Sequence, residues 1–134
     1  MKKLFGVVLT IVMVMSLFAG CNSSNGGDEG AARIKIGAIG PLTGGAAIYG
    51  NAVKNAMELA VEEVNAEGGV QFELNFQDDA HDAETSVNAY GILMDWGMQM
   101  LVGPVTSTPA AAVAAEAEAD GGFMVLFASS KVPV

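Results

Sequence analysis

Residues 34–69 read IKIGAIGPLTGGAAIYGNAVKNAMELAVEEVNAEGG, which is the pattern of a strand, a turn and a helix. It opens with a run that is apolar on both faces, as a buried strand of a parallel sheet requires. A glycine-rich turn follows at 40–45, where adjacent glycines let a ligand approach the main chain. A long amphipathic helix comes next, and Gly68 and Gly69 end it with residues suited to the left-handed conformation. The positions predicted on its buried face are Tyr49, Val53, Met57, Ala60 and Val64.

Strand-like and helix-like segments alternate in the rest of the chain. Strict alternation of apolar and polar residues over 72–76 predicts a strand with one polar face, near a sheet edge. Asp82 suits a helix N-cap, Glu84 lies in the first turn, and Gly97 follows the predicted end of this helix. Its predicted inward positions are Val87, Tyr90, Gly91, Met94 and Trp96.

Two more strands and one more helix complete the pattern. A short buried strand is predicted at 100–102, and Thr108 is predicted to cap a helix whose first residue is Pro109. That helix is alanine-rich over 110–119, and the apolar run 123–127 is predicted to be a fourth strand. The order β-α-β-α-β-α-β predicts an α/β fold, a parallel sheet with helices on both faces.

Ligands of such sheets bind beyond the carboxyl ends of the strands, where the chain order reverses. Three polar loops are predicted at that edge, residues 40–45, 103–108 and 128–131. The second loop enters a helix N-terminus, whose N–H groups and dipole favour an anion, and Ser107 adds a hydroxyl donor. From the residues alone, the polar run 106–108 either binds an anion or only caps the helix.

The first 20 residues have the features of an export signal. Lys2 and Lys3 form a positive start, and the 16 residues 4–19 are apolar apart from three positions. The alternative is a transmembrane helix, but a span needs roughly 20 residues, and this run ends in small residues. Residues 1–20 are therefore predicted to be a signal peptide, and the protein is expected to be exported.

The segment FAGC at 18–21 resembles the lipobox of bacterial lipoproteins, whose cysteine is acylated and becomes the new N-terminus. Phe18 departs mildly, because leucine is more usual there. Cys21 is the only cysteine, so the alternative is an unpaired thiol in an exported protein. We expect Cys21 to anchor the chain to the outer face of the membrane through lipid, and the polar residues 22–30 to form a flexible tether.

The chain is therefore expected to divide into a signal peptide at 1–20, a lipidated cysteine and tether at 21–32, and one folded domain at 33–134. Loss of the signal leaves four basic and fifteen acidic residues, a formal charge of −11 against −9 for the whole chain. Such an acidic chain is not expected to bind nucleic acid, or anionic lipid by electrostatic attraction.

The opening stretch resembles the N-terminus of the type I periplasmic solute-binding proteins, the branched-chain amino acid-binding family of ABC importers. The segments that carry the resemblance, in order and spacing, are IG at 36–37, GPLTG at 40–44, YG at 49–50 and VNAEGG at 64–69. The resemblance implies a substrate-binding subunit for an amino acid, with ABC permease partners and no cofactor. Because family members have two lobes, the chain is expected to be an N-terminal piece that ends within the first lobe. The alternative in the same fold is a ligand-sensing receptor ectodomain.

The resemblance also implies ligand-binding residues. The serine that holds the ligand α-carboxylate falls on Ser107, with Thr108 beside it, and a tyrosine that closes over the ligand falls on Tyr49. The alternative for Tyr49 is a core aromatic on the helix face. Two further contacts fall on Ser129, which fits the family pattern, and on Lys131, which departs from it.

The segment DDAHD at 78–82 places three carboxylates and an imidazole within five residues, which suits a metal. No other part of the chain supplies ligands, so no metal site is expected. The resemblance gives another account: some members carry a disulfide between the positions of His81 and Thr106, and both cysteines are absent here.

Enzyme motifs are missing from the sequence. The glycines of the opening turn do not match G-x-G-x-x-G, and neither G-x-x-x-x-G-K-[ST] nor G-x-S-x-G occurs. The only histidine is His81, so no nucleophile has a plausible base. The protein is therefore not expected to be an enzyme, and the alternative of an exported α/β enzyme would need a catalytic constellation outside this sequence.

Overall fold

The computed structural model describes residues 33–129. The predicted signal peptide, Cys21, the tether and Lys131 lie outside these residues. Within the described part, no helix has the length and apolar character that would let it cross a membrane.

A parallel four-stranded sheet forms the centre of the fold. Its strands are β1 (Ile34–Gly40), β2 (Phe72–Asp78), β3 (Met100–Val102) and β4 (Met124–Val125), in the order β2-β1-β3-β4. All three neighbouring pairs are parallel. The predicted α/β class and the edge position of the alternating strand β2 are confirmed.

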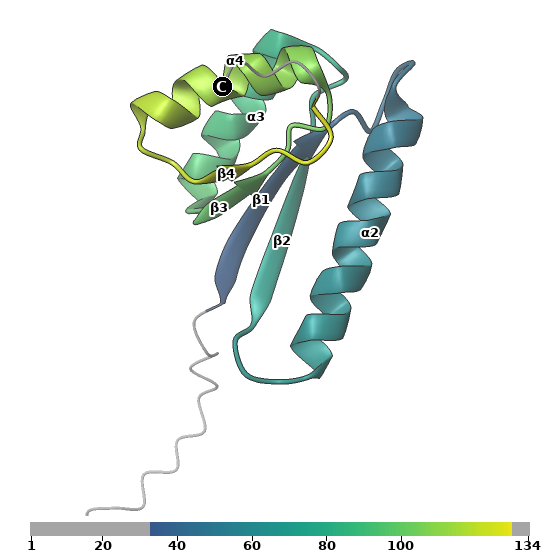
Figure 1. Ribbon diagram of the computed structural model, residues 1–134, viewed down its shortest axis with the longest axis vertical. Coiled ribbons are helices and arrows are strands. Elements are labelled where there is room, and N and C mark those ends of the chain that lie inside the picture. Colours follow the sequence, from purple (N-terminus) through teal and green to yellow (C-terminus); the bar gives the residue numbers. More distant parts are fainter. Residues whose placement is uncertain (1–32, 130–134) are drawn as a thin grey trace, which may run out of the picture.

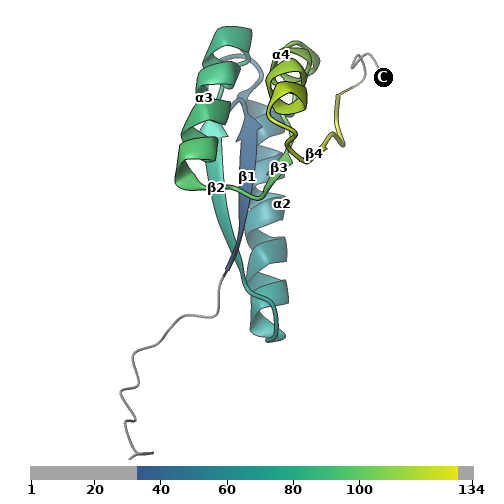
Figure 2. The same cartoon turned by 90° about the vertical axis from the view of Figure 1, so that its left-hand side faces the viewer.

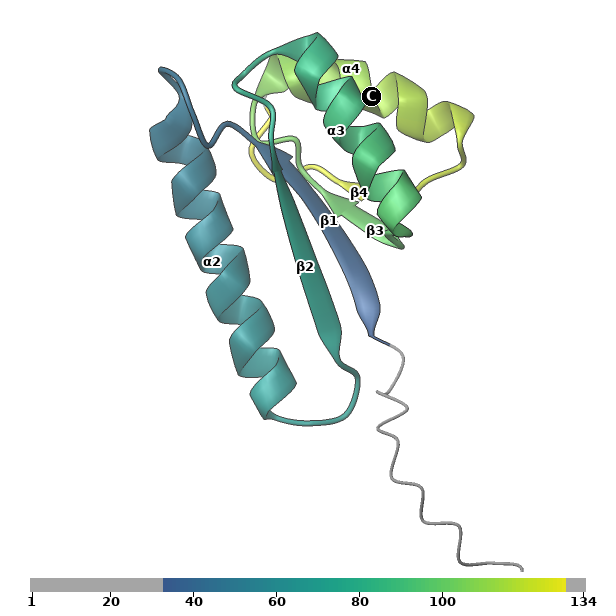
Figure 3. The same ribbon diagram turned by 180° about the vertical axis from the view of Figure 1, so that it is seen from behind.

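Three helices cover the two faces of the sheet: α2 (Ala47–Ala66), α3 (Ala83–Trp96) and α4 (Ser107–Ala119). Helix α2 stands on one side, and α3 and α4 pack together on the other (Figures 1 and 2). Seen from behind, α2 and α3 lie on opposite sides of β1 and β2 (Figure 3). The arrangement confirms the prediction of helices on both faces.

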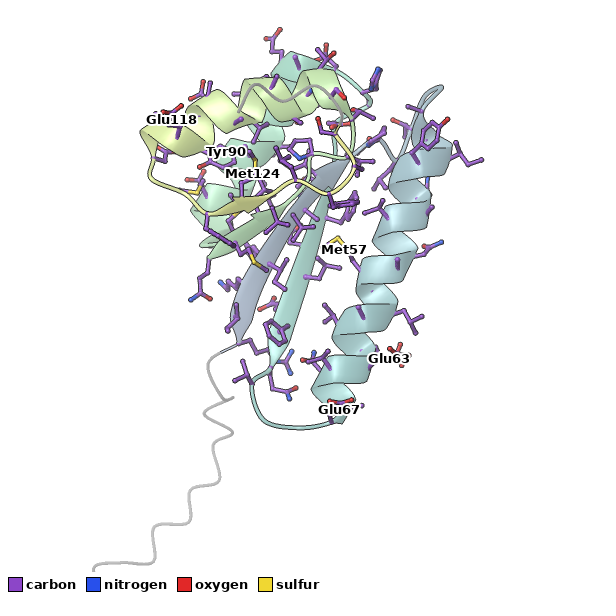
Figure 4. All side chains as sticks on the ribbon, viewed as in Figure 1. Met57, Glu63, Glu67, Tyr90, Glu118 and Met124 are labelled. Carbon is purple, nitrogen blue, oxygen red and sulfur yellow. The ribbon has the colours of Figure 1, made fainter. Side chains whose placement is uncertain are left out.

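The main core lies between the sheet and the helices α3 and α4. It is a cluster of seven buried residues: Ile39, Ala89, Tyr90, Leu93, Leu101, Val113 and Ala117. Figure 4 shows Tyr90 and Met124 between α4 and the strands, and Met124 packs against the cluster. Of the positions predicted to face inward on α3, Tyr90 is buried, whereas Gly91 and Met94 are exposed.

The inward face of α2 is rotated from the predicted one. Tyr49, Ala60 and Val64 are exposed, and the positions of α2 that are buried or half-buried are Ala47, Gly50, Val53, Lys54, Met57, Val61 and Asn65. Figure 4 shows Met57 pointing toward the strands and Glu63 pointing away. The cause is Gly50, because a Cβ on it would lie 1.9 Å from the Pro41 carbonyl oxygen. The helix backbone therefore lies directly on the turn, and this contact sets the rotation of the helix.

Two predicted boundaries are wrong at the C-terminal end of the domain. Thr106, not Thr108, is the N-cap of α4, and Pro109 is its third residue rather than its first. The fourth strand is shorter than 123–127, because it pairs only with the three-residue strand β3. The remaining predicted ends agree with the structure: Gly68 and Gly97 have φ of 81° and 84°, and Asp82 caps α3.

Candidate ligand-binding site

A pocket of about 840 Å³ opens at the carboxyl edge of the sheet. Five segments line it: the start of α2, the β2–α3 loop, the β3–α4 loop, the first turn of α4 and the segment after β4. The lining residues are Ile48, Tyr49, Ala52, Val53, His81, Val105, Thr106, Ser107, Thr108 and Ala128. The strands β1 and β2 point to the end of the sheet where α2 and α4 begin (Figure 1), so the pocket lies where ligands of parallel sheets bind.

Three of the four predicted ligand-binding residues are brought together here. Ser107 and Thr108 line the pocket at the first turn of α4, and Tyr49 lines it from α2. Tyr49 is 65% exposed, so the alternative of a core aromatic is wrong. Ser129 is not among the lining residues; it adjoins Ala128, and its Oγ is buried with no hydrogen-bond partner.

Asp78 fixes the first loop to the end of β2. Its carboxylate accepts hydrogen bonds from the Leu42 N–H at 2.8 Å and from the Thr43 hydroxyl at 2.6 Å. The Ala80 N–H donates to the same carboxylate from the next loop at 2.8 Å. Burial alone would raise the pKa of Asp78, but these donors outweigh it and hold the pKa below its ordinary value.

Asp79 is the buried member of this acidic pair. It is 0% exposed, and its Oδ1 accepts a hydrogen bond from the His81 N–H at 2.9 Å. Its Oδ2 and the hydroxyl of buried Ser86 lie outside good hydrogen-bond geometry with any group, although Ser86 is close enough to lower the pKa of Asp79 slightly. Burial raises the pKa of Asp79, with the charge of Asp78 acting in the same direction.

The three carboxylates of residues 78–82 thus all accept hydrogen bonds from backbone N–H groups. Asp78 and Asp79 hold the amides of Ala80 and His81, and Asp82 caps α3 by accepting from the Thr85 N–H. Within residues 33–129 there is no group of three or more histidine, cysteine, aspartate or glutamate side chains placed to hold a metal ion.

His81 connects the β2–α3 loop to the β3–α4 loop. Its Nδ1 lies 2.9 Å from Oγ1 of Thr106, so the two positions where the resemblance implies a disulfide in some members are joined here by a hydrogen bond. The sequence did not predict this role for His81. The separation of 25 residues gives no local signal, and only the fold brings the two side chains together.

The β3–α4 loop lies across the end of β1. Gly103 has φ of 102°, and a Cβ there would lie 2.7 Å from the Ile39 carbonyl oxygen. The Val105 N–H donates to that same oxygen at 3.1 Å. Val105 is buried and lines the pocket, so this crossing sets one apolar wall close to the α4 N-terminus. No sequence motif predicted Val105, Ile48 or Ala52 as lining residues.

Comparison with known proteins gives consistent matches. A family model described as "Periplasmic binding protein" matches residues 33–133. The Leu/Ile/Val-binding protein BraC3 of Rhizobium johnstonii is 38% identical over 105 residues, which cover 76% of this chain and 28% of that protein. The leucine-, isoleucine-, valine-, threonine- and alanine-binding protein of Pseudomonas aeruginosa is 32% identical over 106 residues, 77% of this chain and 28% of that protein.

A solved structure shows the same fold. It is the branched-chain amino acid transporter substrate-binding protein LivJ from Streptococcus pneumoniae in complex with isoleucine, with a TM-score of 0.69 and 29% identity. The match covers 74% of this chain and 30% of LivJ. The chain spans little more than a quarter of the length of the curated relatives that it matches.

Proposed function

The chain belongs to the periplasmic binding protein family, and we propose that it supplies the first lobe of an amino acid-binding subunit of an ABC importer. The observation that carries the proposal is the pocket at the carboxyl edge, which combines a helix N-terminus with apolar walls. The family is one of binding proteins, and the pocket is accordingly assigned to binding rather than catalysis.

The polar end of the pocket suits a carboxylate. Ser107 and Thr108 are the first two residues of α4, where the helix dipole favours negative charge. Charge-assisted hydrogen bonds at such a position are worth about 1.5–3 kcal/mol each. We assign the α-carboxylate of the ligand to this first turn, with Ser107 as hydroxyl donor.

The apolar end suits an aliphatic side chain. Ile48, Val53 and Val105 line the pocket from two elements. Tyr49 lies at the exposed rim, where its ring can close over a bound ligand. Ser129 is proposed as a further contact to the ligand main chain, because it directly follows the lining residue Ala128.

Titration with L-leucine and with leucinamide tests the assignment. Leucinamide has the same side chain and ammonium group but no carboxylate. We expect leucine to shift the amide resonances of residues 105–108 and leucinamide to do so much more weakly. Ser107→Ala should weaken leucine binding roughly tenfold, since one charge-assisted hydrogen bond is lost. Equal responses to both compounds, or an unchanged affinity in a folded Ser107→Ala chain, would contradict the carboxylate assignment.

The proposed location is the outer face of the cell membrane, with Cys21 as the lipid-bearing residue and permease subunits as partners. Metabolic labelling with a fatty acid tests the anchor. Label should enter the wild-type chain and be absent from Cys21→Ala. Mass spectrometry of the mature N-terminus provides the control, and a chain that starts elsewhere than Cys21 would remove the lipoprotein assignment.

A further inference from the structure

His81 is held in an uncommon backbone conformation at the wall of the pocket. It and Ala80 have φ of 64° and 47°, in the left-handed region that residues other than glycine seldom adopt. Asp78 and Asp79 stabilise this turn by accepting from the two amides. The result is that the imidazole reaches Thr106, with Nδ1 and Oγ1 2.9 Å apart, and both residues line the pocket.

Thr106 is the N-cap of α4, yet its side chain makes no cap hydrogen bond. A threonine at this position normally accepts from the N–H of the second or third helical residue. The third residue here is Pro109, which has no N–H, so the Thr108 amide is the one donor that the Thr106 hydroxyl could satisfy. The Thr106 hydroxyl is instead hydrogen-bonded to Nδ1 of His81.

We propose that His81 is a positioning residue of the binding pocket. By holding the Thr106 hydroxyl, it keeps that hydroxyl away from the Thr108 amide and leaves the amide to an anionic group of the ligand. The inference rests on the proposed function for the nature of the ligand. Beyond that function, we infer that the Thr108 amide is kept for the ligand instead of being capped by the Thr106 hydroxyl. The contact with His81 determines which of the two occurs.

Three substitutions separate this role from a purely structural one. His81→Gly removes the imidazole and suits a positive φ, so the turn is not strained further. His81→Asn keeps a hydrogen-bonding group near the place of Nδ1, and asparagine also tolerates this backbone region. Thr106→Val removes the hydroxyl while nearly preserving the shape of the side chain.

The experiment uses the whole chain, labelled with ¹⁵N and solubilised in a mild detergent, with L-leucine as the probe. In His81→Gly we expect hydrogen exchange of the Thr108 amide to slow about fivefold, because the freed hydroxyl turns back to cap it. The dissociation constant for leucine should rise by a similar factor. Adding Thr106→Val should reverse both changes, since no hydroxyl then competes for the amide, and His81→Asn should restore most of both values.

Two results would overturn the proposal: unchanged Thr108 exchange in His81→Gly, or losses of affinity from His81→Gly and Thr106→Val that add rather than cancel. If leucine shifts no resonance even in the wild-type chain, the proposed function fails for this chain. The exchange rate of the Thr108 amide still decides the role of His81 in that case, because it is measured without ligand.

Discussion

Two neighbouring carboxylates at the end of β2 have opposite electrostatic environments. Asp78 accepts hydrogen bonds from two loops and its pKa is lowered, whereas Asp79 is fully buried and its pKa is raised. A lowered pKa stabilises the fold above the ordinary value of 3.8, and this contribution is lost as the pH falls through the folded-state pKa. A raised pKa does the reverse: the charged form destabilises the fold, and the effect disappears as the pH falls through the folded-state pKa toward 3.8.

Asparagine substitutions at these two positions should therefore change stability in opposite directions. Asp79→Asn should be at least as stable as the wild type near neutral pH, with an advantage that shrinks as the solution is acidified. Its amide oxygen can still accept from the His81 N–H, and its NH₂ group gives the buried Ser86 region a donor. The matched control Asp78→Asn should be less stable near neutral pH, and its deficit should shrink in acid.

Urea unfolding at a series of pH values measures both differences. If the difference in unfolding free energy from the wild type had the same sign and the same pH dependence in both variants, the two carboxylates would not have contrasting environments. Separately, a loss of stability in Asp79→Asn at neutral pH would mean that the charged carboxylate is better satisfied than its geometry indicates.

Local rules predicted several helix ends correctly, although the capping rule placed the start of α4 two residues too late. Asp82, Gly68 and Gly97 have roles defined by the helix end next to them. The sequence did not predict the link between His81 and Thr106, because a side-chain pair 25 residues apart depends on the whole fold. Ser107, Thr108 and Tyr49 were predicted from a family resemblance, and all three line one pocket.

Among the elements, the packing of α2 depends on Gly50, whose backbone lies directly on the turn at Pro41. Alternation and periodicity predicted every strand and helix of residues 33–129. For α2, however, the 3.6-residue pattern fits two inward faces, and one is obtained from the other by moving some positions by one residue. Contact of the Gly50 backbone with the turn at Pro41 selects the observed face. A pattern of apolar residues could not reveal this, because the deciding feature is a missing side chain.

Gly50→Ala should push α2 away from the turn. A Cβ at 1.9 Å from the Pro41 oxygen cannot be accommodated without a backbone shift, and overpacking of this kind costs about 1–3 kcal/mol or more. Gly91→Ala on α3 is the matched control, because a Cβ there meets nothing within 4 Å. That variant should gain up to about 1 kcal/mol from helix propensity.

Chemical denaturation of both variants checks the contrast. If the two alanines had the same effect, the close approach at Gly50 would not set the packing of α2. Leucine titration of Gly50→Ala adds a second readout, since Ile48, Tyr49 and Val53 should move away from the pocket together with the helix.

At the scale of the whole molecule, the described part exposes apolar surface on its β4 side. Strand β4 is the last in the order β2-β1-β3-β4, and among residues 33–129 no strand pairs with its outer side. Phe123 and Phe127 flank it and are 65% and 51% exposed. An unpaired edge beside exposed aromatic side chains is a template for association with another chain.

The chain of this sequence should therefore self-associate through β4. Lysine on an edge opposes pairing by its charge and hydration, so Phe123→Lys together with Phe127→Lys should shift the sedimentation velocity profile toward monomer. Val70→Lys is the matched control: Val70 is also exposed, at 58%, but it lies in the α2–β2 connection, away from β4. Because both substitutions add positive charge to an acidic chain, only an effect specific to the β4 pair supports the edge. A wild-type chain that stays monomeric at high concentration, or equal effects of the β4 pair and Val70→Lys, would show that this edge is protected in solution.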